Sequence, residues 1–195
     1  YNLDKAPLSD ITVFKDKTKF IETFKDFTKR PFLNLQTAGE KRFTDFVKQY
    51  PLFVSKSTVK RDGDFVEKHQ VDEQTDIKKL RQELIDKKEF LIEPYLHQAK
   101  ALQDLYPESL NTLRVITFRD DADEVHILNV ALKLGSGGIR DNYARGGLFS
   151  VPDEHGVIIR PFVNKKGSVY ETHPSSQASL MGFEIPRFDE ALEFA

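Results

Sequence analysis

Two cationic side chains lie within apolar segments in the second half of the chain. Arg114 stands between Leu113 and Val115, and Lys133 stands near the end of the apolar run EVHILNVALKL. Because burial of an unpaired cation costs several kcal/mol, each cation must meet an anion or a solvated cleft. Carboxylates on neighbouring strands or an outward position on a one-sided sheet would satisfy them, and so would a bound anionic ligand.

A glycine-rich segment follows these strands. Five of the ten glycines lie in GSGGIRDNYARGG, together with Arg140, Asn142 and Arg145. Successive glycines allow left-handed backbone conformations that turn several N–H groups toward one anion. The combination suits a phosphate or a carboxylate, and a loop that connects two hairpin strands is an equally good interpretation. Neither GxxxxGK[ST] nor GxGxxG occurs, so no P-loop and no Rossmann fingerprint is predicted.

Two charged residues close short apolar segments in the first half. Lys56 ends LFVSK and precedes a loop with further cations, where it would clamp phosphates or lie solvated on the surface. Glu93 ends FLIEP directly before a proline. An acid at that position would accept ribose hydroxyls, or it would mark the point where a strand reaches water.

Other chemistries find no support in the sequence. The five histidines show no HxxxH or HExxH spacing, so no histidine metal site is predicted. No GxSxG occurs, which removes the signal for a serine hydrolase. The chain has no cysteine, and this excludes disulfides and thiolate zinc sites.

The elements that must position these residues follow from hydrophobic periodicity. Apolar stripes predict helices over 17–27, 39–50 and 72–88, and a last helix that begins near Phe188. A hairpin is predicted from Leu52–Val54 to a strand around Phe65 and Val66, followed by a strand in EFLIEPYL. HQAKALQDLYPES reads as helix or loop. Further strands are predicted in NTLRVITFR, EVHILNVALKL, LFSVP, VIIRPFV and VYET.

Two of these strands, NTLRVITFR and EVHILNVALKL, flank the turn DDAD and form a predicted antiparallel hairpin. Alternation places His126, Leu128, Val130, Leu132 and Leu134 on one face of the second strand, with Ile127, Asn129, Ala131 and Lys133 on the other. Arg114 shares a face with Ile116 and Phe118. Strands mixed with helices, without regular alternation, indicate the α+β class.

Composition sets outer limits on function. The chain has 195 residues and a formal net charge of −2, so charge gives no argument for a nucleic-acid partner. No apolar run is long enough to span a bilayer, and the start YNLDKAPLSD lacks the pattern of a signal peptide. A cytoplasmic protein without a membrane partner is the expectation. The length suffices for one compact domain or two small lobes.

The order of motifs resembles a known family. FLIEPYL, NTLR, ALKLGSGGIRDNYARGGL and HPSSQASLMGFEIPRFDEAL are similar to the ATP-grasp superfamily, and within it to the sugar-transfer-associated ATP-grasp family, which is related to the alpha-L-glutamate ligases. The resemblance runs from about Phe14 to Ala195. Its most specific part is NTLR followed by DNYARGG.

The resemblance implies an ATP-grasp fold of two α+β lobes with antiparallel sheets, over 1–92 and 93–195, with the nucleotide cleft between them. It implies an enzyme that uses ATP and Mg²⁺ to activate a small carboxylate as an acyl phosphate, which an amine then attacks. The pathway it implies is the biosynthesis of capsular or other polysaccharides. A non-catalytic nucleotide-binding module and an ATP-dependent phosphotransferase remain as alternatives.

For the first lobe, the resemblance implies nucleotide contacts at five positions. Lys56 is similar to the lysine that contacts the α- and β-phosphates, and Lys17 resembles an earlier ATP-contacting lysine. Leu91, Ile92 and Glu93 match the hinge that binds adenine through its backbone and ribose through an acid.

For the second lobe, the resemblance implies catalytic residues at Arg114, Lys133, Asn142 and Arg145, and cofactor-binding residues at Gly146 and Gly147. Arg114 matches an arginine that binds phosphate or the intermediate, and Lys133 stands where the family usually has arginine. The loop that closes over the γ-phosphate and the acyl group is matched by Asn142, Arg145, Gly146 and Gly147. Asp141 is a weak candidate for a metal ligand, and a role in stabilising a turn is the alternative.

The chain departs from the family in two places. The loop STVKRDGD keeps only Gly63 of a usually glycine-rich segment. The principal Mg²⁺ ligands of the family, a Glu-x-Asn pattern, are expected beyond Ala195. The chain is therefore expected to be inactive, or nearly so, by itself, and an exposed sheet edge would favour a homodimer.

Overall fold

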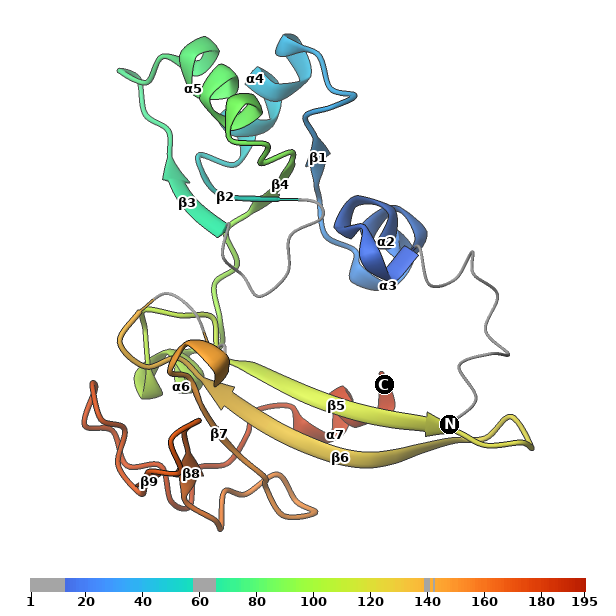
Figure 1. The fold of residues 1–195 in the computed structure, drawn as a ribbon, viewed down its shortest axis with the longest axis vertical. Coiled ribbons are helices and arrows are strands. Elements are labelled where there is room, and N and C mark those ends of the chain that lie inside the picture. The colour runs from blue at the N-terminus through green and yellow to red at the C-terminus, as the bar shows by residue number, and fades with distance from the viewer. Residues whose placement is uncertain (1–12, 58–65, 139–140, 142) are drawn as a thin grey trace. The chain divides into compact units, whose positions relative to one another are not determined.

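The computed structural model describes residues 13–57, 66–138, 141 and 143–195, and it divides the chain into two compact units, Tyr1–Tyr95 and Leu96–Ala195 (Figure 1). The first unit holds a sheet of four strands, and the second holds a sheet of five. Both sheets are antiparallel throughout their pairing. The predicted α+β class is confirmed. The identification of two ATP-grasp lobes over 1–92 and 93–195 stays a prediction.

The first unit surrounds its sheet with short helices. The strands are β1 (Leu33–Asn34), β2 (Leu52–Lys56), β3 (Val66–Gln70) and β4 (Leu91–Pro94), in the order β1-β4-β2-β3. The helices are α2 (Lys17–Thr23), α3 (Lys25–Thr28), α4 (Glu40–Gln49) and α5 (Ile77–Asp86). The predicted β2–β3 hairpin is confirmed by its register, while β1 was not predicted.

The helix predicted over 17–27 is divided into α2 and α3. Asp16 caps α2, because its carboxylate accepts the backbone N–H of Thr18 at 2.9 Å and that of Lys19 at 3.3 Å. Phe24 leaves helical geometry between the two helices, and Lys29 ends α3 in the left-handed conformation. The apolar stripe therefore gave the correct segment and missed the break at Phe24.

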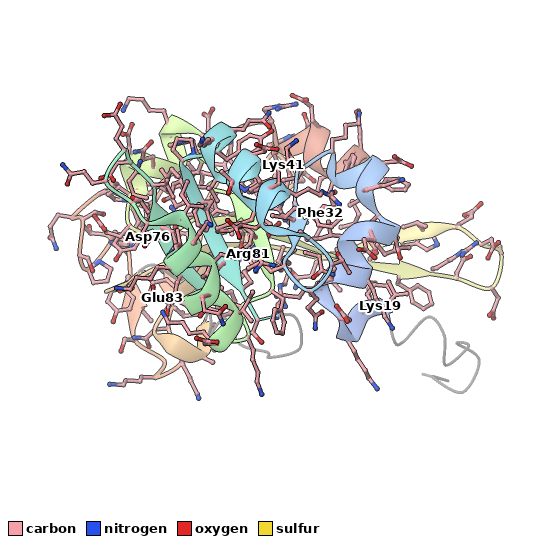
Figure 2. The ribbon with its side chains drawn as sticks, turned by 90° about the horizontal axis from the view of Figure 1, so that it is seen from above. Lys19, Phe32, Lys41, Asp76, Arg81 and Glu83 are labelled. Atoms are coloured by element: carbon pink, nitrogen blue, oxygen red, sulfur yellow. The ribbon has the colours of Figure 1, made fainter. Side chains whose placement is uncertain are left out.

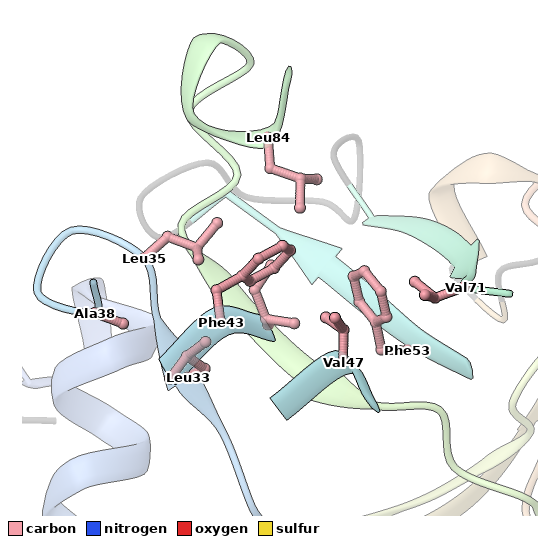
Figure 3. Packing of buried hydrophobic residues seen from close by; sticks show 9 residues of the cluster. Leu33, Leu35, Ala38, Phe43, Val47, Phe53, Val71 and Leu84 are labelled. Carbon is pink, nitrogen blue, oxygen red and sulfur yellow. The ribbon is translucent and has the colours of Figure 1, made fainter. Parts of the chain in front are cut away.

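The core of this unit lies between the sheet and α4 and α5. Phe43 and Val47 of α4 are one turn apart and fully buried against Phe53 of β2, and Leu84 of α5 is buried beside them (Figure 3). The rings of Phe43 and Phe53 meet edge to face at 6.5 Å. The helices predicted over 39–50 and 72–88 are thus confirmed with their buried stripes.

The outer sides of the same helices are charged. Lys41 of α4, and Asp76 and Glu83 at α5, are exposed, as Figure 2 shows. Asp76 also caps α5 by accepting the backbone N–H of Lys79 at 3.0 Å. Each helix therefore exposes its charged face to solvent and packs its apolar face against the sheet.

The second unit is dominated by a long hairpin (Figure 1). Its sheet has the order β5-β6-β7-β8-β9, with β5 (Thr112–Arg119), β6 (Val125–Leu134), β7 (Leu148–Ser150), β8 (Phe162–Val163) and β9 (Val169–Tyr170). Helix α6 (Lys100–Leu105), the short 3₁₀ helix η2 (Tyr143–Arg145) and helix α7 (Phe188–Glu193) complete it. The predicted hairpin, the short VYET strand and the last helix are confirmed.

A β-bulge interrupts the hairpin. Ile116 pairs with Asn129, but Thr117 pairs with Ile127, so Leu128 is an extra residue in β6. Such an insertion shifts the alternation of side chains for every residue on its far side. Hydrophobic periodicity contains no signal for this shift.

The predicted faces of β6 are therefore correct only on one side of the bulge. Between the bulge and the end of the strand, Leu132 and Leu134 are fully buried and Lys133 lies on the opposite face. Beyond the bulge, His126 pairs with Phe118, on the face that carries Lys133. The prediction that His126 shares a face with Leu132 is wrong, because Leu128 shifts the alternation.

The core of the second unit lies under the other face of the sheet. Leu132, Leu134, Phe162 and Leu180 are fully buried there, and Phe188 of α7 joins them. VIIRPFV forms a strand only at Phe162–Val163, so the predicted extent of that strand is wrong. In the described residues of both units, no helix is long and apolar enough to cross a membrane.

Candidate functional site

Two lysines that the sequence singled out meet at the end of β2. Lys56 is the last residue of that strand, and the ammonium of Lys17, from α2, donates to the carbonyl oxygen of Ser57 at 2.9 Å. Burial lowers the pKa of Lys17, and the positive charge of Lys56 lowers it further. An anion placed beside both lysines would relieve that repulsion.

A buried carboxylate balances part of this charge. Glu93 is 1% exposed, and its two carboxylate oxygens form ion pairs with Lys56 and Arg30. The register explains the contact with Lys56: Val54 pairs with Glu93 and Lys56 pairs with Leu91, which puts Lys56 and Glu93 on one face. Two cations thus share one buried acid, and Lys17 lies near one of them, Lys56.

Arg30 was not predicted as a site residue. Its only signal in the sequence is its position directly before Pro31, where the helical segment ends. The ribose role expected of Glu93 stays a prediction, and the geometry gives its carboxylate a different task. It orients Lys56 and Arg30, whose side chains remain 24% and 28% exposed.

The predicted hinge lies on β4, a central strand. Leu91 and Ile92 are buried, and both pair with β1 and β2. Pairing with β1 stops at Ile92, so Glu93 and Pro94 have a strand partner only on the β2 side. The side chains of Leu91 and Ile92 are buried, and that of Glu93 is held in ion pairs. Only the backbone of this segment is therefore suited to contact the adenine base.

A second set of candidate residues lies on the outer face of the β5–β6 hairpin. The Lys133 ammonium lies 3.3 Å from a carboxylate oxygen of Asp141, and the Thr112 hydroxyl donates to the same oxygen. Thr112 pairs with Lys133, and Arg114 pairs with Ala131, so both cations share one face. Arg114 is exposed, and within the described residues it forms no ion pair.

The contacts of Asp141 are those of a residue that holds a loop in place, rather than those of a metal ligand. Its Oδ2 atom is engaged by Thr112 and Lys133, which ties the residue to the face of the hairpin. Within the described residues, no group of three histidine or carboxylate ligands surrounds it. These residues do not by themselves form a site for the Mg²⁺ that the resemblance implies, and we derive no reaction step through such an ion.

Three buried side chains hold the stem of the glycine-rich segment. The Gly135 N–H donates to the Asn111 side-chain oxygen at 3.1 Å, and the Gly138 N–H donates to the Tyr106 hydroxyl at 2.9 Å. The third is His173, whose Nε2 lies 2.7 Å from the Gly135 carbonyl oxygen. The stem is fixed from three directions before the chain reaches residues 139, 140 and 142, which lie outside the described residues.

The partners of His173 define its tautomer. Nδ1 accepts the backbone N–H groups of Ser175 and Ser176, so Nε2 must carry the proton that is donated to Gly135. Burial lowers the pKa of His173, against the smaller effect of that carbonyl. The imidazole ring of His173 is also stacked on the ring of Tyr106, with the ring centroids 4.7 Å apart.

Sequence reasoning missed these anchors, although their motifs were recognised. Asn111 is the first residue of the NTLR motif. Its side-chain amide also donates to the carbonyl oxygens of Leu102 and Tyr106, each at 2.9 Å. His173 opens the HPSSQAS motif. Both motifs were read for resemblance, and nothing in their spacing indicates that they converge on Gly135.

The closing loop is described in part. Asn142 and the side chain of Arg145 lie outside the described residues. Gly146 has φ 98°, a conformation that favours glycine, and its N–H donates to the carbonyl oxygen of Tyr143 at 3.3 Å. Gly147 is buried at the start of β7. The two glycines thus form the turn that ends η2.

Comparison with known proteins shows the family of the chain. A family model described as sugar-transfer associated ATP-grasp matches residues 57–195. The chain belongs to the sugar-transfer associated ATP-grasp family, which indicates an ATP-binding domain of the ligase type. A search of curated proteins finds no match. The matched region begins after Lys17, Arg30 and Lys56, so these three cations are placed by the geometry of the first unit.

Proposed function

We propose that this chain binds ATP as the nucleotide-binding part of a carboxylate–amine ligase. The observation that carries the proposal is the meeting of Lys17 and Lys56 at the end of β2, with Glu93 buried behind Lys56. Lysines at a strand end hold phosphate oxygens by charge and by N–H donation. Membership in an ATP-grasp family supports ATP as the source of those phosphates.

The proposed reaction has two steps. A carboxylate oxygen of the substrate attacks the γ-phosphorus of ATP, the bond to the β–γ bridging oxygen breaks, and ADP leaves. The nitrogen of an amine then attacks the carbonyl carbon of the acyl phosphate, inorganic phosphate leaves, and the amine gives up a proton as the amide forms.

The side chains of this protein contribute positioning and charge. Phosphoryl transfer gains most from cations arranged around the spreading negative charge. Lys17 and Lys56 are assigned to the non-transferred phosphates, and Arg114 and Lys133 to the transferred phosphoryl and acyl groups. Asn142, Arg145, Gly146 and Gly147 are assigned to the closing loop. Mg²⁺, for which the described residues alone form no site, would reduce the negative charge of the phosphates.

We assign the substrates by class. The family description associates this domain with sugar transfer. We therefore propose a small carboxylate and an amine from capsular or other polysaccharide biosynthesis as the joined substrates. The proposal includes no nucleic acid and no lipid.

Binding tests the first part of the proposal. Calorimetry with ATP should show roughly 10- to 100-fold weaker binding for Lys56→Ala and for Arg114→Ala, because each loses a charge-assisted phosphate contact of about 1.5–3 kcal/mol. Lys78→Ala is the matched control, since Lys78 is 79% exposed on α5 and pairs only with Glu40 at the surface. Unchanged affinity in both test variants would overturn the assignment.

Product analysis tests the reaction. Release of ADP and phosphate that depends on both a carboxylate and an amine supports the ligase. ADP without free phosphate would replace it with a phosphotransferase. ATP binding without either product, across a broad panel of acceptors, would leave a nucleotide-binding module and overturn the catalytic part.

A further inference from the structure

A second cluster of chemically active side chains lies in the first unit, away from the lysines. Glu67 and His69 are two residues apart on β3, and Glu89 lies just before β4. One ligand atom from each of the three, either a carboxylate oxygen or an imidazole nitrogen, lies within 4.8 Å of the others.

The register places Glu67 and His69 on the opposite face from the phosphate candidates, and Glu89 joins them through its contact with Ser55. Ser55 pairs with Glu67, and Phe53 pairs with His69. Because neighbours along a strand alternate between faces, these side chains lie opposite that of Lys56. The cluster is therefore separate from the proposed ATP contacts, and the inference does not depend on the proposed function.

Glu89 is the unusual member of the cluster. It is 1% exposed, and its contact is the hydroxyl of Ser55, which donates to Oε2. Within the described residues, no lysine, arginine or histidine forms an ion pair with Glu89. A buried carboxylate without a cation is costly, so this arrangement points to a positively charged ligand.

The donor set identifies the class of ligand. We propose that Glu67, His69 and Glu89 bind a divalent transition-metal ion, with Zn²⁺ as the reference ion. One imidazole nitrogen and two carboxylates form a common protein donor set for such ions and leave a coordination position for water. Mg²⁺ and Ca²⁺ are poorer candidates, since they prefer oxygen ligands alone.

Metal binding would replace contacts that the ligands already make. Glu67 forms an ion pair with Lys87 at 2.7 Å, but the two side chains are 44% and 50% exposed, so water readily replaces that contact. The His69 Nε2 lies 2.8 Å from the Ser55 hydroxyl, whose proton goes to Glu89, so Nε2 donates to Ser55 and would give up that proton on binding the metal. Burial lowers the pKa of His69, which favours the neutral imidazole that metals bind.

The structural consequence of the bound metal concerns β2. It would connect β3 to the residues before β4, across the strand that carries Lys56. The ring of His69 is already stacked on Phe53 of β2 at 4.9 Å. A metal bound only by the folded chain would raise the stability of this unit.

A comparable cluster in the second unit provides the control. Asp120, Glu124 and His126 also gather within 4.8 Å, at the tip of the β5–β6 hairpin. Asp120 already accepts the backbone N–H groups of Ala122 and Glu124 at 2.9 Å and contacts His126 at 2.8 Å. No member is deeply buried, so this cluster has no equivalent of Glu89.

Calorimetry with ZnCl₂ on the chelator-treated chain tests the proposal. We expect one site, with affinity reduced about 100-fold or more in His69→Ala and in Glu89→Gln, because loss of a direct ligand should exceed the 10- to 100-fold effect of outer contacts. His126→Ala should bind like the parent chain. Absence of zinc binding, or loss of binding in His126→Ala alone, would overturn the proposal.

A second measurement avoids the risk that a variant fails to fold. One equivalent of Co²⁺ added to the unmodified chain should shift the ring signals of His69 in the proton NMR spectrum and leave those of His126 unchanged. Unshifted His69 signals at saturation would overturn the proposal, whatever the variants show.

Discussion

The ammonium of Lys17 donates to the carbonyl oxygen of Ser57 at 2.9 Å, which brings a residue of α2 to the end of β2, beside Lys56. The contact holds two like charges near each other, and the pKa of Lys17 falls through burial and through that repulsion. Under the proposed function, phosphate oxygens would offset that repulsion.

ATP affinity should therefore depend on pH through Lys17. Bound phosphate favours the charged lysine, so binding raises its pKa and takes up a proton. As the pH rises through the lowered pKa of the free protein, Lys17 loses its charge and affinity should fall. Calorimetry across this alkaline range should show a smaller decrease in Lys17→Arg, whose guanidinium stays charged. Identical pH profiles for the parent and this variant would remove Lys17 from the site.

The ion pairs of Glu93 should stabilise the first unit. Glu93→Gln keeps the shape but leaves Arg30 and Lys56 without their shared anion, and a loss of about 1–3 kcal/mol in the free energy of unfolding is expected. Glu40→Gln removes the partner of an exposed lysine, and there the change should stay within about 0.5 kcal/mol. Urea denaturation measures both, and equal effects would contradict a special role for Glu93.

The stability of the second unit should decrease in acid through His173. Its pKa is lowered in the folded state, so the unfolded chain binds more protons and the free energy of unfolding increases with pH. The stabilisation is complete above the ordinary histidine pKa of about 6.5 and is lost as the pH falls from there toward the lowered value.

His173→Gln isolates this effect from that of His69, whose pKa is also lowered by burial. Urea unfolding between neutral and mildly acid pH should show a shallower dependence for the variant, by up to about 1.4 kcal/mol per pH unit. Parallel pH profiles for the variant and the parent would contradict a lowered pKa of His173 in the folded state.

Gly156 should tolerate no side chain. Its φ is 81°, and an added Cβ would lie 2.6 Å from the Cγ atom of Phe188. Gly156→Ala combines backbone strain with overpacking and should cost about 2–4 kcal/mol. Gly167→Ala is the matched control, because its φ is 79° and nothing lies within 4 Å, so only about 1–2 kcal/mol of strain is expected. Equal losses in urea denaturation would show that the contact with Phe188 is unimportant.

The sequence was informative where local periodicity decides the structure. The buried stripe of α4, with Phe43 and Val47, and the alternation of Leu132 and Leu134 in β6 could both be predicted, because a single element determines which side is buried. Lys56 could be named from its place at the end of an apolar strand, whereas Lys17 could be named only through the family resemblance. Their proximity depends on the contact of Lys17 with Ser57, and no local pattern encodes that contact.

The remaining site residues depend on contacts between distant segments. Arg30 acquires its role from Glu93, and Asn111 and His173 acquire theirs from Gly135. A histidine in HPSS and an asparagine in NTLR look like ordinary polar residues until the chain is folded. The cluster of Glu67, His69 and Glu89 was not predicted for the same reason, since Glu89 is distant in sequence from His69.

The bulge at Leu128 separates the hairpin into two surfaces that can change independently. Between the bulge and the end of β6, substitutions must preserve the alternation that buries Leu132 and presents Lys133. Beyond the bulge, the side chains of Val125 and Ile127 are exposed and do not follow that alternation. We therefore expect the tip of the hairpin to tolerate substitution better than the half that carries Arg114 and Lys133.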